Sequence, residues 1–318
     1  MHLKIEPLHD KNRNCLEDNI ATILNFLGES CELLYVLSWN FEFLPQYLYT
    51  TNSLGRRMYV DEKCTWQSLN IFYGIKPKYY KLSKLTQIYD IVNSSIDYGI
   101  PLLLQVDAYD LPWADAYRRY HILHYCIISG YENSKNNFLC LDPYINGKIN
   151  LLNVEALNMN SKVIMLTKNK VFISERDIVS AFINQIKANM FSNIRNFAYE
   201  IKYNFDIIDE VNNIKHLYLV PFFMQLHCLN SIRQNLSKMF KYLGDRYDIE
   251  YHRISYEMKN SYLQWQKVKK TFIAIGNGTY QNDRKYYDYC SNLLYDIAKH
   301  EEKIAQDIKC IFEKKYIL

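Results

Sequence analysis

Residues 121–143 read HILHYCIISGYENSKNNFLCLDP, two short apolar runs separated by a polar segment. The runs 125–131 and 137–142 have the composition and length of buried strands. The polar residues between them are typical of a turn, so the stretch predicts an antiparallel hairpin. If the turn is centred on Asn133, His124 and Asp142 lie directly opposite one another on the two strands.

The flanking sequence extends this hairpin into a larger α/β unit. Further strands are expected at 101–106, 148–152 and 162–167, with an Asn-Gly turn at 146–147. Residues 15–27 carry apolar side chains with the i, i+3, i+4 spacing of a helix, and Gly28 stands at the position of a C-terminal cap. We therefore expect a mainly antiparallel sheet preceded by a helix that starts at Cys15.

The character of the sequence changes beyond Lys168. Long segments with helical periodicity follow at 178–190, 222–243, 254–275 and 286–312, and Gly244 and residues 276–278 are expected at the breaks between them. A chain of 318 residues usually contains more than one domain. The expected fold is α+β, with a first domain at 1–168 and a helical domain at 169–318.

Composition excludes several classes of protein. Hydrophobic residues make up 49% of the chain, which is enough for packed cores, but the longest apolar runs are only a handful of residues long. A membrane-spanning helix needs about 18 or more, so no membrane segment is expected. The charged N-terminus lacks the apolar core of a secretory signal, and the eight scattered cysteines indicate reduced thiols in the cytoplasm. No C-x-x-C occurs, so no metal site is expected.

The second half of the chain carries the positive charge. Residues 169–318 contain 22 Lys and Arg against 17 Asp and Glu. Such a region can attract an acidic protein, although an ordinary solvated surface has the same composition. The 29 tyrosines are spread along the whole chain and do not form a base-stacking platform, so no nucleic-acid partner is expected.

Three residues of the first half have the chemistry of a cysteine-based catalytic triad. Cys15 begins a helix, where the helix dipole and unpaired backbone N–H groups stabilise a thiolate. His124 stands at the mouth of a strand, and a carboxylate at Asp142 can accept its second N–H and fix the orientation of the ring. Taken singly, each residue has an ordinary alternative, namely a packing cysteine, a hydrogen-bonded sheet histidine and a strand-ending Asp-Pro turn.

The same residues belong to a longer pattern. It comprises Asn14-Cys15-Leu16-Glu17-Asp18, Asp107-x-Tyr109-x-Leu111-Pro112-Trp113, Tyr117, His121-x-x-His124, Gly130-Tyr131 and Asp142-Pro143. This pattern resembles the N-terminal domain family of the butirosin-biosynthesis acyltransferase BtrH, which is related to the papain-like C39 cysteine peptidases. The resemblance covers roughly residues 8–168 and implies a papain-like fold.

The resemblance also implies an activity. It predicts an acyltransferase of natural-product biosynthesis that takes an acyl group from a carrier-protein thioester and delivers it to an amine, forming an amide. Cys15 would be the nucleophile, His124 the base and Asp142 the third member. The acyl donor would be the phosphopantetheine arm of an acyl or peptidyl carrier protein, with no other cofactor. The amide-forming, papain-like enzyme of closthioamide assembly, which uses a diamine acceptor, is similar in logic.

The oxyanion donor and two other functions stay open. Papain-like enzymes have a glutamine six residues before the nucleophile, where this chain has His9. His9, the Asn14 side chain and the Cys15 backbone N–H are therefore all candidates. His121 is a rival base, but on a regular strand it faces away from the side that carries His124. A C39-like peptidase or amidase would share the triad, and a non-catalytic carrier-binding module would not need it.

Overall fold

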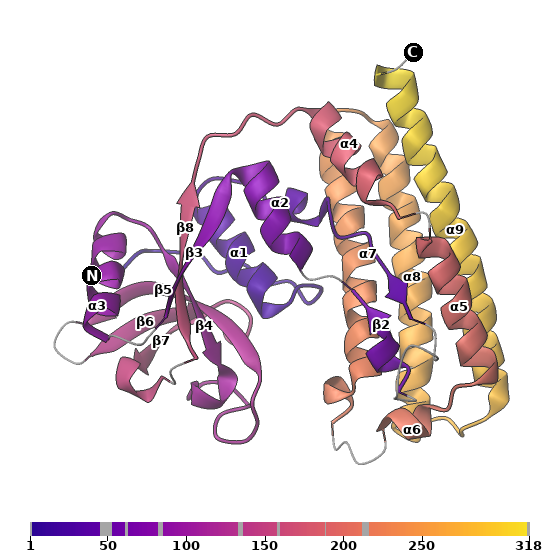
Figure 1. The fold of residues 1–318 in the computed structure, drawn as a ribbon, viewed down its shortest axis with the longest axis horizontal. Helices are drawn as coiled ribbons and strands as arrows, with labels where there is room; N and C mark the ends of the chain where they lie inside the picture. The colour runs from indigo at the N-terminus through magenta and orange to yellow at the C-terminus, as the bar shows by residue number, and fades with distance from the viewer. Residues whose placement is uncertain are drawn as a thin grey trace. The chain divides into compact units, whose positions relative to one another are not determined.

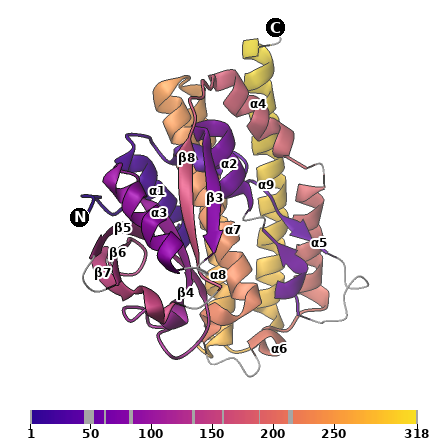
Figure 2. The same cartoon turned by 60° about the vertical axis from the view of Figure 1, so that its left-hand side comes forward.

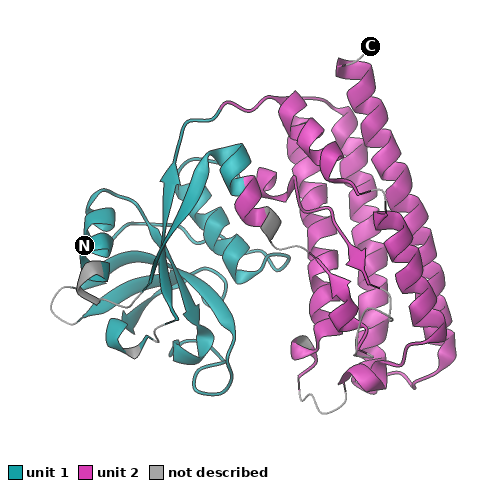
Figure 3. Cartoon of the chain, in the orientation of Figure 1, with its two compact units in different colours: residues 1–31, 69–171 teal, residues 32–68, 172–318 magenta. Residues whose placement is uncertain are grey.

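The structure is a computed structural model of the chain, and it describes residues 2–44, 53–60, 63–81, 85–132, 136–157, 160–187, 189–211 and 216–316. The chain divides into two compact units (Figure 3). The first contains residues 1–31 and 69–171, and the second contains residues 32–68 and 172–318. The division expected from the sequence, at residue 168, assigned residues 32–68 to the first domain, whereas here they pack with the helices.

The first unit is built on one antiparallel sheet of six strands in the order β3-β8-β4-β5-β6-β7 (Figure 1). Its strands are β3 (Ile75–Lys81), β4 (Leu102–Asp107), β5 (Leu123–Glu132), β6 (Asn137–Asp142), β7 (Lys148–Asn153) and β8 (Lys162–Lys168). The expected antiparallel α+β arrangement is thus confirmed. The edge strand β3 has no counterpart among the predicted strands.

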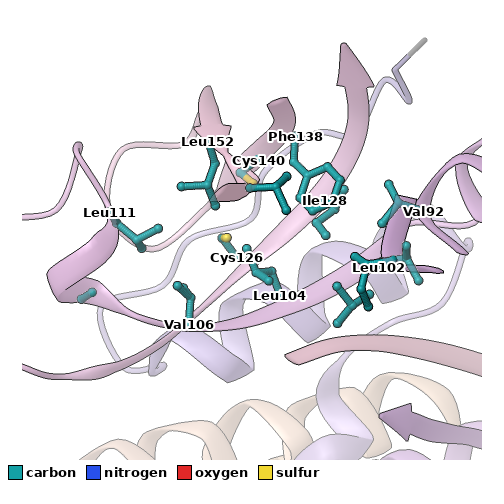
Figure 4. Packing of buried hydrophobic residues seen from close by; sticks show 14 of the residues in the cluster. Val92, Leu102, Leu104, Val106, Leu111, Cys126, Ile128, Phe138, Cys140 and Leu152 are labelled. Carbon is teal, nitrogen blue, oxygen red and sulfur yellow. The ribbon is translucent and has the colours of Figure 1, made fainter. Parts of the chain in front are cut away.

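Two helices of this unit pack against β5. They are α1 (Cys15–Phe26) and α3 (Leu85–Asp97). Figure 4 shows side chains of β4, β5 and β6 gathered with Val92 of α3, and the labelled members of this core are nearly inaccessible to solvent. Helix α1 begins at Cys15, as expected, and its end is marked by Gly28, whose φ of 77° suits glycine. The contacts between α1 and β5 therefore place the helix that begins with Cys15 against the strand that carries His124.

The second unit consists mainly of helices. They are α4 (Glu175–Gln185), α5 (Met190–Tyr203), α6 (Ile207–Val211), α7 (Pro221–Arg246), α8 (Glu250–Gly276) and α9 (Arg284–Tyr316). In both views α7, α8 and α9 run side by side (Figures 1 and 2). The expected helix at 178–190 starts and ends earlier, as α4, and α5 begins at Met190. The expected break at Gly244 is wrong because this residue lies inside α7. A Cβ at Gly244 would lie 2.7 Å from Nδ1 of His252, so glycine permits a close approach here.

A buried carboxylate explains why residues 32–68 belong to the helical unit. Glu301 on α9 is fully buried and forms a two-point ion pair with Arg233 on α7 at 2.9 and 3.0 Å. The same carboxylate accepts hydrogen bonds from the indole N–H groups of Trp39 and Trp265, at 3.1 and 2.9 Å. Trp39 therefore attaches this early segment to helices that are more than 190 residues away in sequence. The unit also contains η1 (Glu32–Tyr35) and the two-stranded sheet of β1 (Glu42–Phe43) and β2 (Met58–Tyr59); α2 (Lys63–Tyr73) spans the division between the units.

Candidate active site

A complete N-terminal cap sets the start of helix α1 at Cys15. The Asn14 side chain accepts the backbone N–H of Glu17 at 2.9 Å, and the Glu17 carboxylate accepts the backbone N–H of Asn14, also at 2.9 Å. This reciprocal pair is a capping box, which defines the first turn of the helix. Cys15 is the first helical residue and is partly exposed. Its sulfur thus lies at the positive end of the helix dipole, where an anion is stabilised.

A buried asparagine ties that first turn to strand β5. The Asn19 amide donates to the backbone carbonyl of Cys15 at 2.6 Å and to that of Tyr125 at 2.8 Å. Asn19 is inaccessible to solvent, so its amide makes these bonds without competition from water. Because Tyr125 follows His124 directly, this bridge holds the nucleophile candidate beside the base candidate.

His124 and Asp142 are brought together by the hairpin of β5 and β6. His124 Nε2 lies 2.8 Å from Asp142 Oδ2, and the two residues are 5% and 0% exposed. With Nε2 engaged by the carboxylate, Nδ1 is the ring nitrogen left for the hydrogen bond that His124 forms with Cys15. The three residues expected to form a triad therefore lie in one connected group.

The register of the hairpin differs from the expected one. Ile127 pairs with Leu141, so His124 and Asp142 are diagonal neighbours on one face and not direct partners. A bulge between Ile128 and Gly130 shifts the register by one residue, so the pairing differs from the expected one by three residues on the turn side of the bulge and by two residues on the side of the site. The proposed turn centre at Asn133 lies outside the described residues. Near the site, the observed pairing differs from the expected one by two residues. Side chains two residues apart lie on the same face of a strand, so His124 and Asp142 still meet.

Asp142 is the best-connected polar group of the site. Its Oδ2 also accepts the indole N–H of Trp113 at 2.9 Å, and its Oδ1 accepts the backbone N–H of Ile145 at 3.0 Å. Burial by itself raises the pKa of this carboxyl, but the hydrogen bonds and the charge of His124 outweigh burial and hold the pKa below its usual value. Asp142 is therefore a fixed anion at neutral pH.

The electrostatics favour a protonated His124. Burial lowers the pKa of the imidazole, but the hydrogen bonds and charges of Asp142 and Cys15 more than compensate and raise that pKa to about 9. A protonated imidazole beside a cysteine favours the thiolate, which is the reactive form of a cysteine nucleophile.

The other three candidate residues occupy different positions. The Asn14 oxygen is used by the helix cap. His121 is 74% exposed and contacts Asp107 through Nδ1 at 2.7 Å, while its ring stacks on Tyr109. His121 thus belongs to a separate surface pair. His9 lies nearer to the triad, because its ring contacts Tyr144, which in turn contacts the ring of His124.

Two residues that position the triad were given no role in the sequence analysis. Trp113 was part of the quoted pattern, but nothing in the sequence indicated that its N–H reaches a carboxylate 29 residues later. Asn19 is an amide on the buried side of an amphipathic helix, four residues after Cys15. An amide at such a position is a usable signal, because a buried polar side chain requires a partner.

The described ranges contain neither a metal-binding cluster nor a membrane-spanning helix. No group of three or more His, Cys, Asp or Glu side chains in them is arranged to hold a metal ion. None of the helices formed by the described residues combines the length and apolar character needed to span a bilayer. The seven cysteines with described side chains are free thiols.

Comparison with known proteins finds a family model that matches part of the chain. No curated protein matches the chain. The family model described as butirosin biosynthesis protein H, N-terminal, matches residues 14–143. This segment begins one residue before Cys15, ends one residue after Asp142 and includes His124 and Trp113. Residues 14–143 are thus similar to the butirosin biosynthesis protein H N-terminal family.

Proposed function

We propose that this chain is a cysteine-dependent acyltransferase that forms amides from a carrier-protein thioester. The observation that carries the proposal is the connected group of Cys15, His124 and Asp142, with the sulfur at a helix N-terminus and the imidazole pKa raised to about 9. A papain-like enzyme also requires a cysteine on a helix that packs against an antiparallel sheet, with the histidine and the aspartate on that sheet. The matched family name refers to biosynthesis, which favours a synthetic role over peptide cleavage.

The chemistry follows from the protonation state of the pair. The Cys15 thiolate attacks the thioester carbonyl carbon, and the resulting tetrahedral intermediate expels the donor thiol, which takes a proton from the His124 imidazolium. The enzyme then carries the acyl group on Cys15. An amine attacks this second thioester, neutral His124 accepts the amine proton, and the Cys15 thiolate leaves as the amide forms. Protons and charge balance over the cycle, and no cofactor takes part.

The substrate classes are part of the proposal. The donor is an acyl group on the phosphopantetheine arm of a carrier protein, and the acceptor is a small amine or diamine. The excess of Lys and Arg over Asp and Glu at 169–318 supports an acidic protein partner, which carrier proteins often are.

Intact-protein mass spectrometry tests this function directly. Purified enzyme incubated with an acyl-pantetheine thioester should gain the mass of the acyl group, and the Cys15→Ala variant should not. Addition of a diamine should then discharge the adduct and release an amide. Discharge only to the free acid would indicate a hydrolase, and cleavage of a peptide substrate without thioester loading would indicate a C39-like peptidase. Amide formation that Cys15→Ala leaves unchanged would contradict the catalytic role of the thiol.

A further inference from the structure

A second imidazole–carboxylate pair lies beside the triad. His9 Nδ1 is 2.7 Å from Oδ2 of Asp18, which is fully buried in the first turns of α1. Asp18 follows Cys15 by three residues, so the two side chains project from the same side of the helix. The carboxylate thus connects His9 to the turn that carries the nucleophile.

The surroundings of Asp18 fix the position of His9. The other carboxylate oxygen accepts the backbone N–H of Asp10 at 3.2 Å and lies 4.0 Å from the guanidinium of Arg13. A buried carboxylate without such partners would be costly, so this arrangement orders the loop from His9 to Arg13 before the helix starts. The imidazole also has an edge-on contact with Tyr144, whose ring centroid is 5.9 Å from that of His9.

This arrangement leaves one nitrogen of His9 available for substrate. Nδ1 is engaged by Asp18, so Nε2 is the remaining ring nitrogen. When Nε2 carries a hydrogen, it can donate a hydrogen bond to a substrate oxygen. His9 is about half exposed, with 51% of its side chain accessible, so Nε2 can meet an incoming molecule.

We infer that His9 donates a hydrogen bond through Nε2 to the thioester carbonyl oxygen when that oxygen becomes negative, and that Asp18 is the positioning residue for His9. This inference rests on the proposed acyl transfer. Attack by the thiolate moves the carbonyl π electrons onto oxygen, and a pre-oriented donor stabilises that charge. When the intermediate expels the donor thiol, the electrons return to the carbonyl and the hydrogen bond weakens.

Two variants of His9 separate hydrogen bonding from packing. His9→Phe keeps a ring against Tyr144 but removes the donor, and His9→Gln keeps an N–H donor without an imidazole. Single-turnover acylation of Cys15 by an acyl-pantetheine thioester should slow by about 10²–10³ in His9→Phe, which is the usual cost of losing one oxyanion donor. It should stay within about tenfold of wild type in His9→Gln.

Alkylation by iodoacetamide provides the matched control. Its attack occurs at a saturated carbon and creates no oxyanion, so Cys15 in both variants should be alkylated at the wild-type rate. Asp18→Asn should slow acylation when it is made in the wild-type enzyme, which retains His9. The double variant Asp18→Asn, His9→Gln should be acylated as fast as His9→Gln alone. A purely structural role of Asp18 would instead slow both backgrounds equally.

The outcomes distinguish this inference from the function on which it rests. Wild-type acylation in His9→Phe overturns the inference alone, and so does an equal loss of acylation and alkylation, because His9 would then act on the thiol. A wild-type enzyme that alkylates normally but accepts no acyl group from the thioester overturns the proposed function, and the inference with it.

Discussion

Replacing Asp142 with asparagine tests whether the Asp142 carboxylate keeps His124 protonated. The substitution keeps the shape of the side chain but replaces one acceptor oxygen with an NH₂ donor. In the wild type, Oδ2 accepts from His124 and Trp113 and Oδ1 accepts from Ile145. If the amide oxygen faces His124, the NH₂ group opposes the backbone N–H of Ile145; in the other orientation it opposes the two ring N–H groups. Either orientation leaves a buried clash between donors.

The expected decrease in the rate of Cys15 alkylation follows from the loss of the Asp142 charge. A hydrogen bond to a charged partner contributes about 1.5–3 kcal/mol. Since about 1.4 kcal/mol corresponds to a factor of ten, Asp142→Asn should slow iodoacetamide alkylation of Cys15 at pH 7 by about 10- to 150-fold. The cause is the pKa of His124, which falls once the carboxylate is gone because burial alone lowers it. The imidazolium that stabilises the thiolate is then lost near neutral pH.

The same substitution should change how stability depends on pH. The pKa of His124 is raised from 6.5 to about 9 in the folded protein. Its contribution, on the order of 3 kcal/mol, is therefore fully present below pH 6.5 and is lost as the pH rises through about 9. The free energy of unfolding of the wild type, measured by urea titration, should decline over that window, and the decline should be smaller in Asp142→Asn.

One result would refute this reasoning. If Asp142→Asn folds, and both its alkylation rate at pH 7 and its loss of stability between pH 6.5 and 9 equal those of the wild type, then Asp142 does not determine the charge of His124. Peptide mapping identifies the alkylated residue, and Cys15→Ala is the control: its peptide at position 15 should gain no mass, whereas the exposed Cys310 can react in both proteins.

Two further predictions concern other polar groups. Trp113→Phe removes one donor to the Asp142 carboxylate while keeping an aromatic ring, so alkylation of Cys15 should slow about tenfold, the effect of a hydrogen bond of about 1.5 kcal/mol to a charged group; an unchanged rate would show that the indole N–H is dispensable. Glu301→Gln leaves the buried Arg233 charge uncompensated and should lower the urea-derived free energy of unfolding by about 3–5 kcal/mol. The exposed neighbour is the control, since Glu302→Gln should cost less than about 1 kcal/mol, and equal losses would contradict the assignment.

Local signals in the sequence predicted much of the site. The start of α1 was readable because apolar spacing and a cap residue act within a few residues of Cys15. The proximity of His124 and Asp142 was predicted from the hairpin although the expected register was wrong. Side chains on a strand alternate between faces, so an error of two residues kept both on one face. An error of one residue would have moved Asp142 to the other side of the sheet.

The features that sequence reasoning missed depend on distant partners. Nothing in the composition of residues 32–68 indicates that they pack with the helices, because that placement depends on Trp39 meeting a carboxylate 262 residues later. Arg57 is similar: it is almost fully buried and pairs with Glu200 at 3.0 Å. Periodicity predicts which face of a segment is buried, but it does not identify the partner of a buried polar group.

The two histidines beside Cys15 differ in the nitrogen that their carboxylates engage. Asp142 engages Nε2 of His124, which leaves Nδ1, the nitrogen nearer the backbone, for the sulfur that α1 brings close to β5. Asp18 engages Nδ1 of His9, which leaves Nε2, the nitrogen farther from the backbone. A base that accepts a proton from a fixed sulfur must lie close to it and be shielded from water, and His124 is 5% exposed. A donor to an arriving carbonyl needs longer reach and access from solvent, which is the position that His9 occupies.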